Sequence, residues 1–415
     1  MKLKQIRVDG YKNLIDCEVN LGDFNVLVGP NNSGKSNFLE LFQILGGICF
    51  GDDEVRETIL TGMTPETRLS LSICHLKGHE NKPLTIGINF EILIKQKKWN
   101  VDYEIKVKCS RPKKSKGGVL EERLSAKIVG RKGPRTEYIL RNEKKLIVYT
   151  NGTKKTSHPI SANNISLQAI RSLYPDNKGL APEFEHFYKA ISQIAGMRTF
   201  AFSPQGLREK FNEEQKIKGL RISSFDLLLV LDKLKKEAKY LDLFKETMCD
   251  ILDLEEVLFD VEDIKLSPGK KGEEISKRSR YLFIKRRGDR WSWFQEYSDG
   301  TFVVAGILAS LFSEDDRGPI LCLEELENCL HPAAIEKLLR FLQDNADKWP
   351  VLITTHSSYL LNGVNPEDVN VAVVDETGAT RFKKVKNSKG LQNYLNKSLM
   401  SFGDLLVDNY KRFRE

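Results

Sequence analysis

Apolar and polar residues alternate over much of the N-terminal part of the chain, a pattern that predicts β-strands. Two strands are expected within residues 1–30, with a turn at Gly10–Asn13 between them. The alternation returns in three later stretches, residues 68–76, 84–94 and 99–108. Shorter strands, separated by breaks rich in Gly, Lys and Pro, are expected up to about residue 150. This part of the chain is therefore predicted to form antiparallel strands.

The spacing of apolar residues changes after a turn-rich stretch at residues 151–164. Residues 183–194 form an amphipathic helical pattern, and residues 225–254 carry leucines at mixed three- and four-residue spacings. Such a leucine face is typical of a helix that packs in a core, although it could also bind a partner. A loop is expected at residues 267–272, and strands are expected to resume near residues 280–285.

Composition restricts the class of protein. A chain of 415 residues is long enough for two or three domains with sizeable cores. No apolar run approaches the roughly 20 residues needed to cross a bilayer, and the N-terminus lacks the apolar core of a signal peptide. The seven cysteines are scattered and include no C-x-x-C pair, which favours reduced thiols. We therefore expect a cytoplasmic protein without a membrane partner.

Positive charge is concentrated in one segment, Lys95–Lys155. The segment holds 19 Lys or Arg against six Asp or Glu, an excess of 13 positive charges, whereas the whole chain has a net charge of +8. One interpretation is a contact surface for duplex DNA or an acidic partner. The alternative is a solvated antiparallel sheet whose lysines protect its edges from aggregation. The sequence leaves both interpretations open, because no pattern of aromatic residues accompanies the charge.

The octapeptide GPNNSGKS at residues 29–36 matches the pattern G-x-x-x-x-G-K-[ST]. An apolar, strand-like run precedes it, and a helix is expected from residue 36 to residue 46. A strand, a glycine-rich turn and a helix N-terminus together form a cradle for phosphate, because backbone N–H groups and the positive helix end point at the same place. Lys35 would reach the β- and γ-phosphates, and Ser36 would place its hydroxyl on Mg²⁺. The residues expected to bind the nucleotide are Gly29, Pro30, Asn31, Asn32, Ser33, Gly34, Lys35, Ser36 and Asn37.

Two further strands end in residues suited to hydrolysis. The buried-type run at residues 320–323 is followed by Glu324 and Glu325. We assign Glu324 to hold Mg²⁺ through water and Glu325 to act as general base for the attacking water. The alternative is a helix start, where carboxylates are also favoured. The β-branched run at residues 351–355 ends at His356, which would contact the γ-phosphate and the attacking water.

A second helix N-terminus lies upstream of these strands. Ser298, Asp299 and Gly300 open an apolar helix expected at residues 302–312. Taken alone, this pattern indicates only a capped helix.

The order of the four motifs resembles that of the ATP-binding-cassette (ABC) ATPases. In that comparison residues 29–36 are Walker A, 298–301 the signature, 320–325 Walker B, and His356 the switch histidine. Walker A lies almost at the N-terminus and far from the signature, which resembles the RecF and SMC (structural maintenance of chromosomes) branch and not the transporter subunits. The resemblance covers residues 1 to about 50 and about 290 to 375.

Within that branch, two runs are most similar to the OLD (overcoming lysogenization defect) ATPases and their stand-alone relatives of the AAA type. These runs are EELENCLHP at residues 324–332 and TTHSSYLL at residues 354–361. In that group the Walker B Asp is often Glu, as Glu324 is here. The sequence ends at residue 415, soon after His356, which we expect to leave no room for the TOPRIM nuclease domain of an OLD nuclease.

The resemblance implies an α/β fold, an ABC-ATPase-like P-loop NTPase head with an inserted region that is first β-rich and then helical. A discontinuous ATPase core is expected at residues 1–94 and 281–385. A basic β-rich insertion is expected at 95–160, a helical insertion at 161–280, and a C-terminal tail at 386–415.

The resemblance also implies a Mg²⁺-dependent ATPase in which ATP is held between two chains. Walker A and Walker B of one chain would face Ser298, Asp299 and Gly300 of another, which needs a homodimer or a higher oligomer. The leading hypothesis is a switch or scaffold in prokaryotic antiphage defence that acts with a separate nuclease or toxin. The alternative is a RecF-like repair ATPase that binds duplex DNA through Lys95–Lys155. A transporter-type subunit is disfavoured by the spacing of the motifs.

Overall fold

The computed structural model describes residues 1–52, 55–56, 59, 79, 82–108, 117–150, 154–175, 178–197, 199–200, 227–266, 275–313, 318–328, 330–386, 391, 395 and 400–408. It consists of two compact units: unit 1 holds residues 1–198, 318–322 and 346–415, and unit 2 holds residues 199–317 and 323–345. The strand predicted at 68–76 and the loop predicted at 267–272 lie outside the described residues, as does most of the predicted tail at 386–415.

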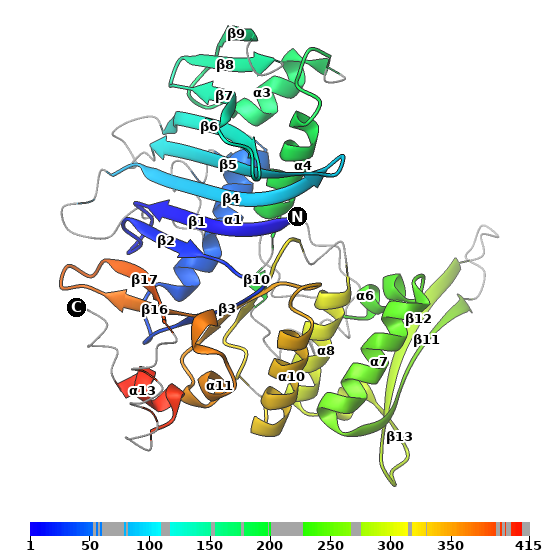
Figure 1. Ribbon diagram of the computed structural model, residues 1–415. Helices are drawn as coiled ribbons and strands as arrows, with labels where there is room; N and C mark the ends of the chain where they lie inside the picture. Colours follow the sequence, from blue (N-terminus) through cyan, green and yellow to red (C-terminus); the bar gives the residue numbers. More distant parts are fainter. Residues whose placement is uncertain are drawn as a thin grey trace. The chain divides into compact units, whose positions relative to one another are not determined.

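Unit 1 contains an eight-stranded sheet in the order β2-β1-β4-β5-β6-β7-β8-β9, with antiparallel neighbours throughout (Figure 1). Its strands are β1 (Lys2–Asp9), β2 (Cys17–Asn20), β4 (Leu84–Ile94), β5 (Lys97–Lys108), β6 (Gly118–Ile128), β7 (Thr136–Arg141), β8 (Lys145–Thr150) and β9 (Lys154–Pro159). The strands predicted at 84–94 and 99–108 are thus confirmed. Period-two alternation identified them because one face of the sheet is buried and the other faces solvent.

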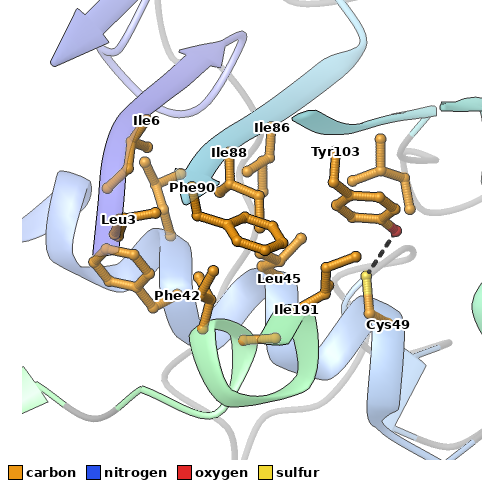
Figure 2. Close-up of a cluster of buried hydrophobic side chains, with 14 of the residues drawn as sticks. Leu3, Ile6, Phe42, Leu45, Cys49, Ile86, Ile88, Phe90, Tyr103 and Ile191 are labelled. Carbon is orange, nitrogen blue, oxygen red and sulfur yellow. Dashed lines mark hydrogen bonds between the residues drawn. The ribbon is translucent and has the colours of Figure 1, made fainter. Parts of the chain in front are cut away.

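The buried face of this sheet packs against helices α1 (Lys35–Phe50) and α4 (Phe184–Ala195) (Figure 2). Phe90 and Tyr103 come from neighbouring strands, and Phe42 and Ile191 come from the two helices. A third helix, α3 (Ser166–Leu173), lies against α1. Burial of these large side chains is the main favourable contribution to folding in this unit.

The sheet crosses the domain boundary expected from the sequence. Residue 95 lies in the turn between β4 and β5, so the expected core and the expected basic insertion share one continuous sheet. Helices α3 and α4 also belong to unit 1, whereas residues 227–266 and 275–286 belong to unit 2. Alternating strands look alike whether they extend a sheet or start a new one, so composition alone could not locate this division.

A buried polar network crosses the interior face of the sheet. Glu122 on β6 and Arg141 on β7 are directly opposite, with side chains fully buried and 3.7 Å apart. Glu122 also accepts hydrogen bonds from the Tyr103 hydroxyl at 3.0 Å and from the Ser166 backbone N–H at 2.8 Å. Tyr103 in turn lies 3.3 Å from the Cys49 Sγ (Figure 2). Burial raises the pKa of both the Cys49 thiol and the Tyr103 hydroxyl, so both groups remain protonated.

Replacing Arg141 with methionine is expected to lower the free energy of unfolding by about 3–5 kcal/mol, because Glu122 would remain buried without its cation. Urea denaturation followed by circular dichroism measures the change. The matched control is Arg123→Met, which removes the exposed Arg123–Glu137 pair from the same two strands and should cost at most about 1 kcal/mol. Equal effects of the two changes would contradict a structural role for the buried pair.

The second sheet of unit 1 is mostly parallel and is built around β3 (Phe24–Val28), whose five residues are all buried. Five of its strands lie in the order β14-β15-β3-β16-β17. They include β15 (Val351–Thr355), β16 (Val369–Val374) and β17 (Thr380–Lys384). β15 and β16 are parallel to β3, whereas β17 is antiparallel to β16. Short helices α11 (Ser358–Asn362), η3 (Pro366–Asp368) and α13 (Phe402–Asp408) complete the unit.

Unit 2 contains a small antiparallel sheet with helices packed against one of its faces (Figure 1). Its elements are β10 (Thr199–Phe200), α6 (Leu227–Leu234), α7 (Ala238–Leu252), β11 (Leu254–Leu266), β12 (Ile275–Arg286), β13 (Trp291–Trp293), η2 (Phe294–Glu296), α8 (Asp299–Phe312) and α10 (Pro332–Asp344). The leucine-rich stretch predicted as helical contains two helices, in which Leu227, Leu231, Leu234 and Leu241 are buried as expected, whereas Leu229 is exposed. Strand β14 (Leu321–Glu324) begins in unit 1 and ends in unit 2.

Candidate nucleotide-binding site

The glycine-rich loop joins the central strand β3 to helix α1, as the sequence predicts. Asn32 and Gly34 both have positive φ, 64° and 87°, and this left-handed backbone turns the chain from the strand into the helix. Gly34 is the N-cap of α1, and no side chain caps the helix there. The first backbone N–H groups of α1 therefore have no intrahelical partner and are oriented to bind an anion.

Lys35 is the charged residue of the motif, and its ammonium group lies inside the loop. Its side chain is buried, and its Nζ donates hydrogen bonds to the carbonyl oxygens of Gly29 at 2.7 Å and Pro30 at 3.0 Å. These two bonds hold the ammonium group against the backbone that would surround a phosphate. The adjacent Ser36 is exposed in the first turn of α1, where its hydroxyl can reach a metal ion bound to the same phosphates.

Two glycines of the loop cannot carry a side chain. A Cβ atom on Gly29 would lie 2.7 Å from Ser33 Oγ and 2.8 Å from Ala372 Cβ, and one on Gly34 would lie 2.8 Å from Asn13 Oδ1. Ser33 Oγ is buried and has no hydrogen-bond partner among the described residues. A tight backbone loop with a lysine and an unsatisfied hydroxyl fits a polyanionic ligand such as a triphosphate.

Replacing Gly29 with alanine is expected to abolish measurable nucleotide binding, because the new methyl group would push Ser33 and the loop backbone out of place. Binding of a fluorescent ATP analogue measures this loss. Gly22→Ala is the matched control, since its Cβ would meet only ordinary contacts at 3.7 Å or more. Retention of full affinity by Gly29→Ala would show that the loop does not hold phosphate in this geometry.

The turn before β2 contributes residues that sequence analysis placed in a turn without assigning them a role. Asn13 donates from Nδ2 to Thr380 Oγ1 at 2.9 Å and accepts from Asn37 Nδ2 at 2.8 Å. Lys12, which has a positive φ, donates to Asn37 Oδ1 at 3.1 Å and pairs with Glu40. Asn37, predicted to bind nucleotide, thus also ties the start of α1 to this turn. The available signal was Gly10, whose left-handed φ of 80° marks a tight turn.

His356 lies beside the loop because of strand register. Thr355 pairs with Val28 in the parallel β15–β3 ladder, so His356 and Gly29 are the next residues on adjacent strands. Neighbouring strands are about 4.8 Å apart. The His356 side chain is exposed, and Ser357 caps the following helix by accepting a hydrogen bond from the Leu360 N–H at 3.4 Å. The histidine is therefore held at the carboxyl edge of the sheet.

The acidic pair follows β14. Glu324 is the last residue of that strand, and Glu325 has a positive φ of 49°. A glutamate in the left-handed region is uncommon and costs of order 1 kcal/mol or more, and such residues cluster at functional sites. Asn328 Nδ2 donates to Glu325 Oε2 at 2.8 Å, which helps to fix the carboxylate. Both acids are counted with unit 2, whereas the strand begins in unit 1.

The predicted signature residues begin α8 in unit 2. Ser298 and Asp299 are exposed, whereas residues 301–312 of the helix are all buried. The Ser298 hydroxyl lies 3.2 Å from Thr301 Oγ1 and does not cap a backbone N–H. No side chain therefore caps the N-terminus of α8, and the N–H groups of Thr301 and Phe302 bond to the Ser298 carbonyl oxygen at 3.0 and 3.4 Å.

The basic segment has two kinds of charge. On the strands, cations pair with acids on neighbouring strands, including Lys98 with Glu91 at 2.8 Å and Lys106 with Glu121 at 3.7 Å. At one end of the sheet, adjacent turns bring together exposed cations that include Lys95, Lys97, Lys127, Arg131 and Lys132. The ion pairs on the strands fit the interpretation of a solvated sheet. The exposed cations of the turns could contact DNA, and that contact stays a prediction. Residues 109–116 and 151–153 of the segment lie outside the described part.

Residues 24–362 match the family model AAA_21, described as "AAA domain, putative AbiEii toxin, Type IV TA system". The chain belongs to the AAA_21 family. The match begins at β3 and ends in α11, so it includes the loop, the acidic pair and His356.

Individual relatives agree with this assignment over parts of the AAA_21 chain. The DNA replication and repair protein RecF from two Vibrio cholerae O1 strains is 30% identical over 91 residues. That match spans 21% of this chain and 25% of each RecF sequence, so only a quarter of the curated relatives' length is matched. A solved SMC head bound to the C-winged helix domain of ScpA covers 94% of this chain and all of that chain, with a TM-score of 0.51 and 13% identity. The fold is therefore that of an ABC-ATPase-like head. Within the described residues, no helix is long and apolar enough to span a membrane.

Proposed function

We propose that this AAA_21 protein is an ATP-driven switch, which closes two copies around ATP and opens them after hydrolysis. The observation that carries the proposal is the loop at residues 29–34, a backbone cradle that only glycine permits and that holds Lys35 at its centre. In this mechanism, Lys35 and the N–H groups of α1 bind the β- and γ-phosphates. Loss of the γ-phosphate removes the charge that holds the closed state.

The residues at the site suit Mg²⁺. Its preferred ligands are oxygen atoms, and it commonly takes one or two protein groups together with substrate phosphates and water. From their places in the two sequence motifs, we assign the Ser36 hydroxyl and the Glu324 carboxylate as these protein groups. When bound, Mg²⁺ would neutralise phosphate charge in the transition state. Glu325 would take the proton of the attacking water, and His356 would orient that water and contact the γ-phosphate.

Dimerisation through the signature residues is part of the same proposal. Ser298, Asp299 and Gly300 lie at an exposed helix N-terminus, which is the kind of site that binds a phosphate. We propose that they contact the γ-phosphate held by the second copy. ATP would then be a ligand shared by two chains, and the free energy of ATP binding would stabilise the closed dimer.

A charge-reversing change at the signature tests this dimer. In a Glu325→Gln background with ATP and Mg²⁺, Ser298→Glu should leave ATP bound but keep the protein monomeric, because its carboxylate would repel the γ-phosphate. Ser298→Ala, which adds no charge, is the matched control and should still dimerise. Size-exclusion chromatography with light scattering measures the mass. Persistent dimers of Ser298→Glu would contradict contact in trans, and a monomer in every variant would contradict the switch itself.

We further propose a role in prokaryotic antiphage defence with a separately encoded effector, a nuclease or a toxin. The family description reads "putative AbiEii toxin, Type IV TA system", and a toxin–antitoxin system consists of two proteins, which supports action together with a second protein. Tagged Glu325→Gln protein, purified from its native host with ATP and Mg²⁺, should retain that effector stoichiometrically, whereas Lys35→Ala should not. Equal recovery with both variants would contradict nucleotide-controlled binding, and recovery of DNA alone would favour the second candidate.

The second candidate is a RecF-like ATPase that binds duplex DNA. It is favoured by the RecF match and by the cations of the adjacent turns at residues 95–97 and 129–135. Arg131→Glu with Lys132→Glu should then weaken duplex binding strongly at low salt and reduce its salt dependence. Unchanged binding by that double variant would assign the positive excess to the solvated sheet.

A further inference from the structure

One face of the three-stranded sheet in unit 2 is aromatic and open to solvent. Strands β11, β12 and β13 place alternate side chains on opposite faces. One face packs with α7 and includes the buried residues Val257, Phe259, Leu282 and Ile284. The other face carries Leu258, Tyr281, Phe283, Trp291 and Trp293, and the register aligns Leu258, Phe283 and Trp293 in one row across the three strands.

The rings on this face support one another. The centroids of Phe283 and Trp293 are 4.5 Å apart, and those of Tyr281 and Trp293 are 5.9 Å apart. Even so, Trp293 is 45% exposed and Trp291 is 41% exposed, which is unusual for the largest apolar side chain. The two indoles are two residues apart on one strand, so they stand on the same face at a spacing of roughly 6.6 Å. The face is thus a prearranged array of aromatic surfaces.

Positive charge lies next to this array. The turn between β12 and β13 holds two exposed arginines, Arg287 and Arg290, against a single acid, Asp289. Two acids of β11 pair with lysines, Glu255 with Lys285 at 2.5 Å and Asp260 with Lys235 at 3.8 Å. Glu256 and Glu262 also lie on β11, are exposed, and share the face of Leu258. The turn therefore offers cations to an anionic ligand beside the aromatic face.

We propose that this face binds single-stranded nucleic acid, whose bases stack on Trp291 and Trp293 and whose phosphates contact the arginines of the turn. Unpaired bases can reach an aromatic side chain with their π-face, whereas the bases of a duplex are stacked on one another. An antiparallel sheet with exposed aromatic residues beside cations is a known physical solution for such binding. The role is independent of nucleotide hydrolysis, because every residue involved lies on this sheet of unit 2 or in its turn.

Fluorescence anisotropy of the full-length chain with labelled 20-nucleotide oligo-dT, oligo-U and a 20-base-pair duplex tests the proposal. Trp293→Ala and Trp291→Ala should each weaken binding of a single strand by about 5- to 150-fold, which corresponds to about 1–3 kcal/mol for each stacked base. Arg287→Glu with Arg290→Glu should weaken it further at low salt and reduce the salt dependence. Leu93→Ala, at an apolar site that is 69% exposed in unit 1, is the matched control and should change nothing.

Tryptophan fluorescence gives a second readout. Of the four tryptophans, Trp349 is buried and Trp99 is half-buried against Phe187, so quenching by oligo-dT would come mainly from the two exposed indoles. Lys35→Ala should bind the single strand normally, which separates this proposal from the ATP switch. The proposal is overturned if no single strand binds at low salt. It is equally overturned if Trp293→Ala binds like the wild type, or changes only the oligomeric state, since the face would then be a protein interface.

Discussion

Glu325→Gln is expected to lower the rate of ATP hydrolysis by at least about 100-fold while ATP binding persists. Loss of a positioned general base typically costs 10²- to 10⁴-fold, and an amide of the same shape cannot accept the proton. The glutamine Oε1 can still accept the hydrogen bond that Asn328 donates at 2.8 Å, so the left-handed backbone at this residue should be retained. Phosphate release measures turnover, and binding of a fluorescent ATP analogue measures affinity.

The matched control for this change is Glu336→Gln. Glu336 lies on α10 of the same unit and is 62% exposed in an ion pair with Arg340. It loses the same charge in the same unit but has no place in the mechanism, so turnover should be unchanged. Hydrolysis by Glu325→Gln at the wild-type rate would show that another group is the base.

In contrast, Glu324→Gln should raise the Mg²⁺ concentration needed for turnover, because this residue is assigned to the metal.

Lys35→Ala is expected to weaken ATP binding by at least about 100-fold. The ammonium group is buried inside the loop and would make charge-assisted bonds to two phosphates, each contributing about 1.5–3 kcal/mol, and 1.4 kcal/mol is a factor of ten. Because the hydrogen bonds from Nζ to Gly29 and Pro30 are also lost, the loop loses its internal cation. Isothermal titration calorimetry with ATP and Mg²⁺ measures the affinity.

The control for Lys35 is Lys2→Ala, which removes an equally charged side chain from β1. Lys2 is 43% exposed and pairs with Asp23 just before β3, outside the loop. Its loss should change neither ATP affinity nor turnover, and surface pairs of this kind contribute at most about 1 kcal/mol to stability. Thermal denaturation of both variants should show folded protein. Wild-type affinity in Lys35→Ala would contradict the assignment of the loop as the phosphate site.

Local sequence predicted the elements whose signal lies within a few residues. The strands at residues 84–94 and 351–355 are observed with the same bounds, and the helix after the loop runs from Lys35 to Phe50. Each carries its own pattern: alternation for a half-buried strand, a β-branched run for a buried parallel strand, and a G-x-x-x-x-G-K-S turn between strand and helix. The same locality made the order of the motifs informative before any fold was known.

Other elements were missed because their signals were weak or short. Residues 1–30 form three strands and not two, since β2 has only four residues. Strand β11 directly follows α7. Its alternation of apolar and polar residues is interrupted at Val257-Leu258-Phe259, because Leu258 is apolar and exposed. Three consecutive apolar residues resemble a continuation of the preceding helix. That leucine is exposed because it belongs to the aromatic face, where the usual rule of apolar inside and polar outside does not hold.

The sequence by itself determined that the protein has a phosphate loop, an acidic pair and a histidine, each at the end of a strand, because these depend on neighbours in the chain. Only the tertiary structure decided which of them share an edge: the register of Thr355 with Val28 sets His356 beside Gly29. The tertiary structure also decided which charged side chains are buried and which are exposed. Glu122 and Arg141 are buried together, whereas Arg131 and Lys132 remain exposed, and nothing in their local sequence distinguishes them. The physical reason is that burial and pairing are set by strands brought together from distant parts of the chain, and the desolvation cost of a charge depends on those neighbours alone.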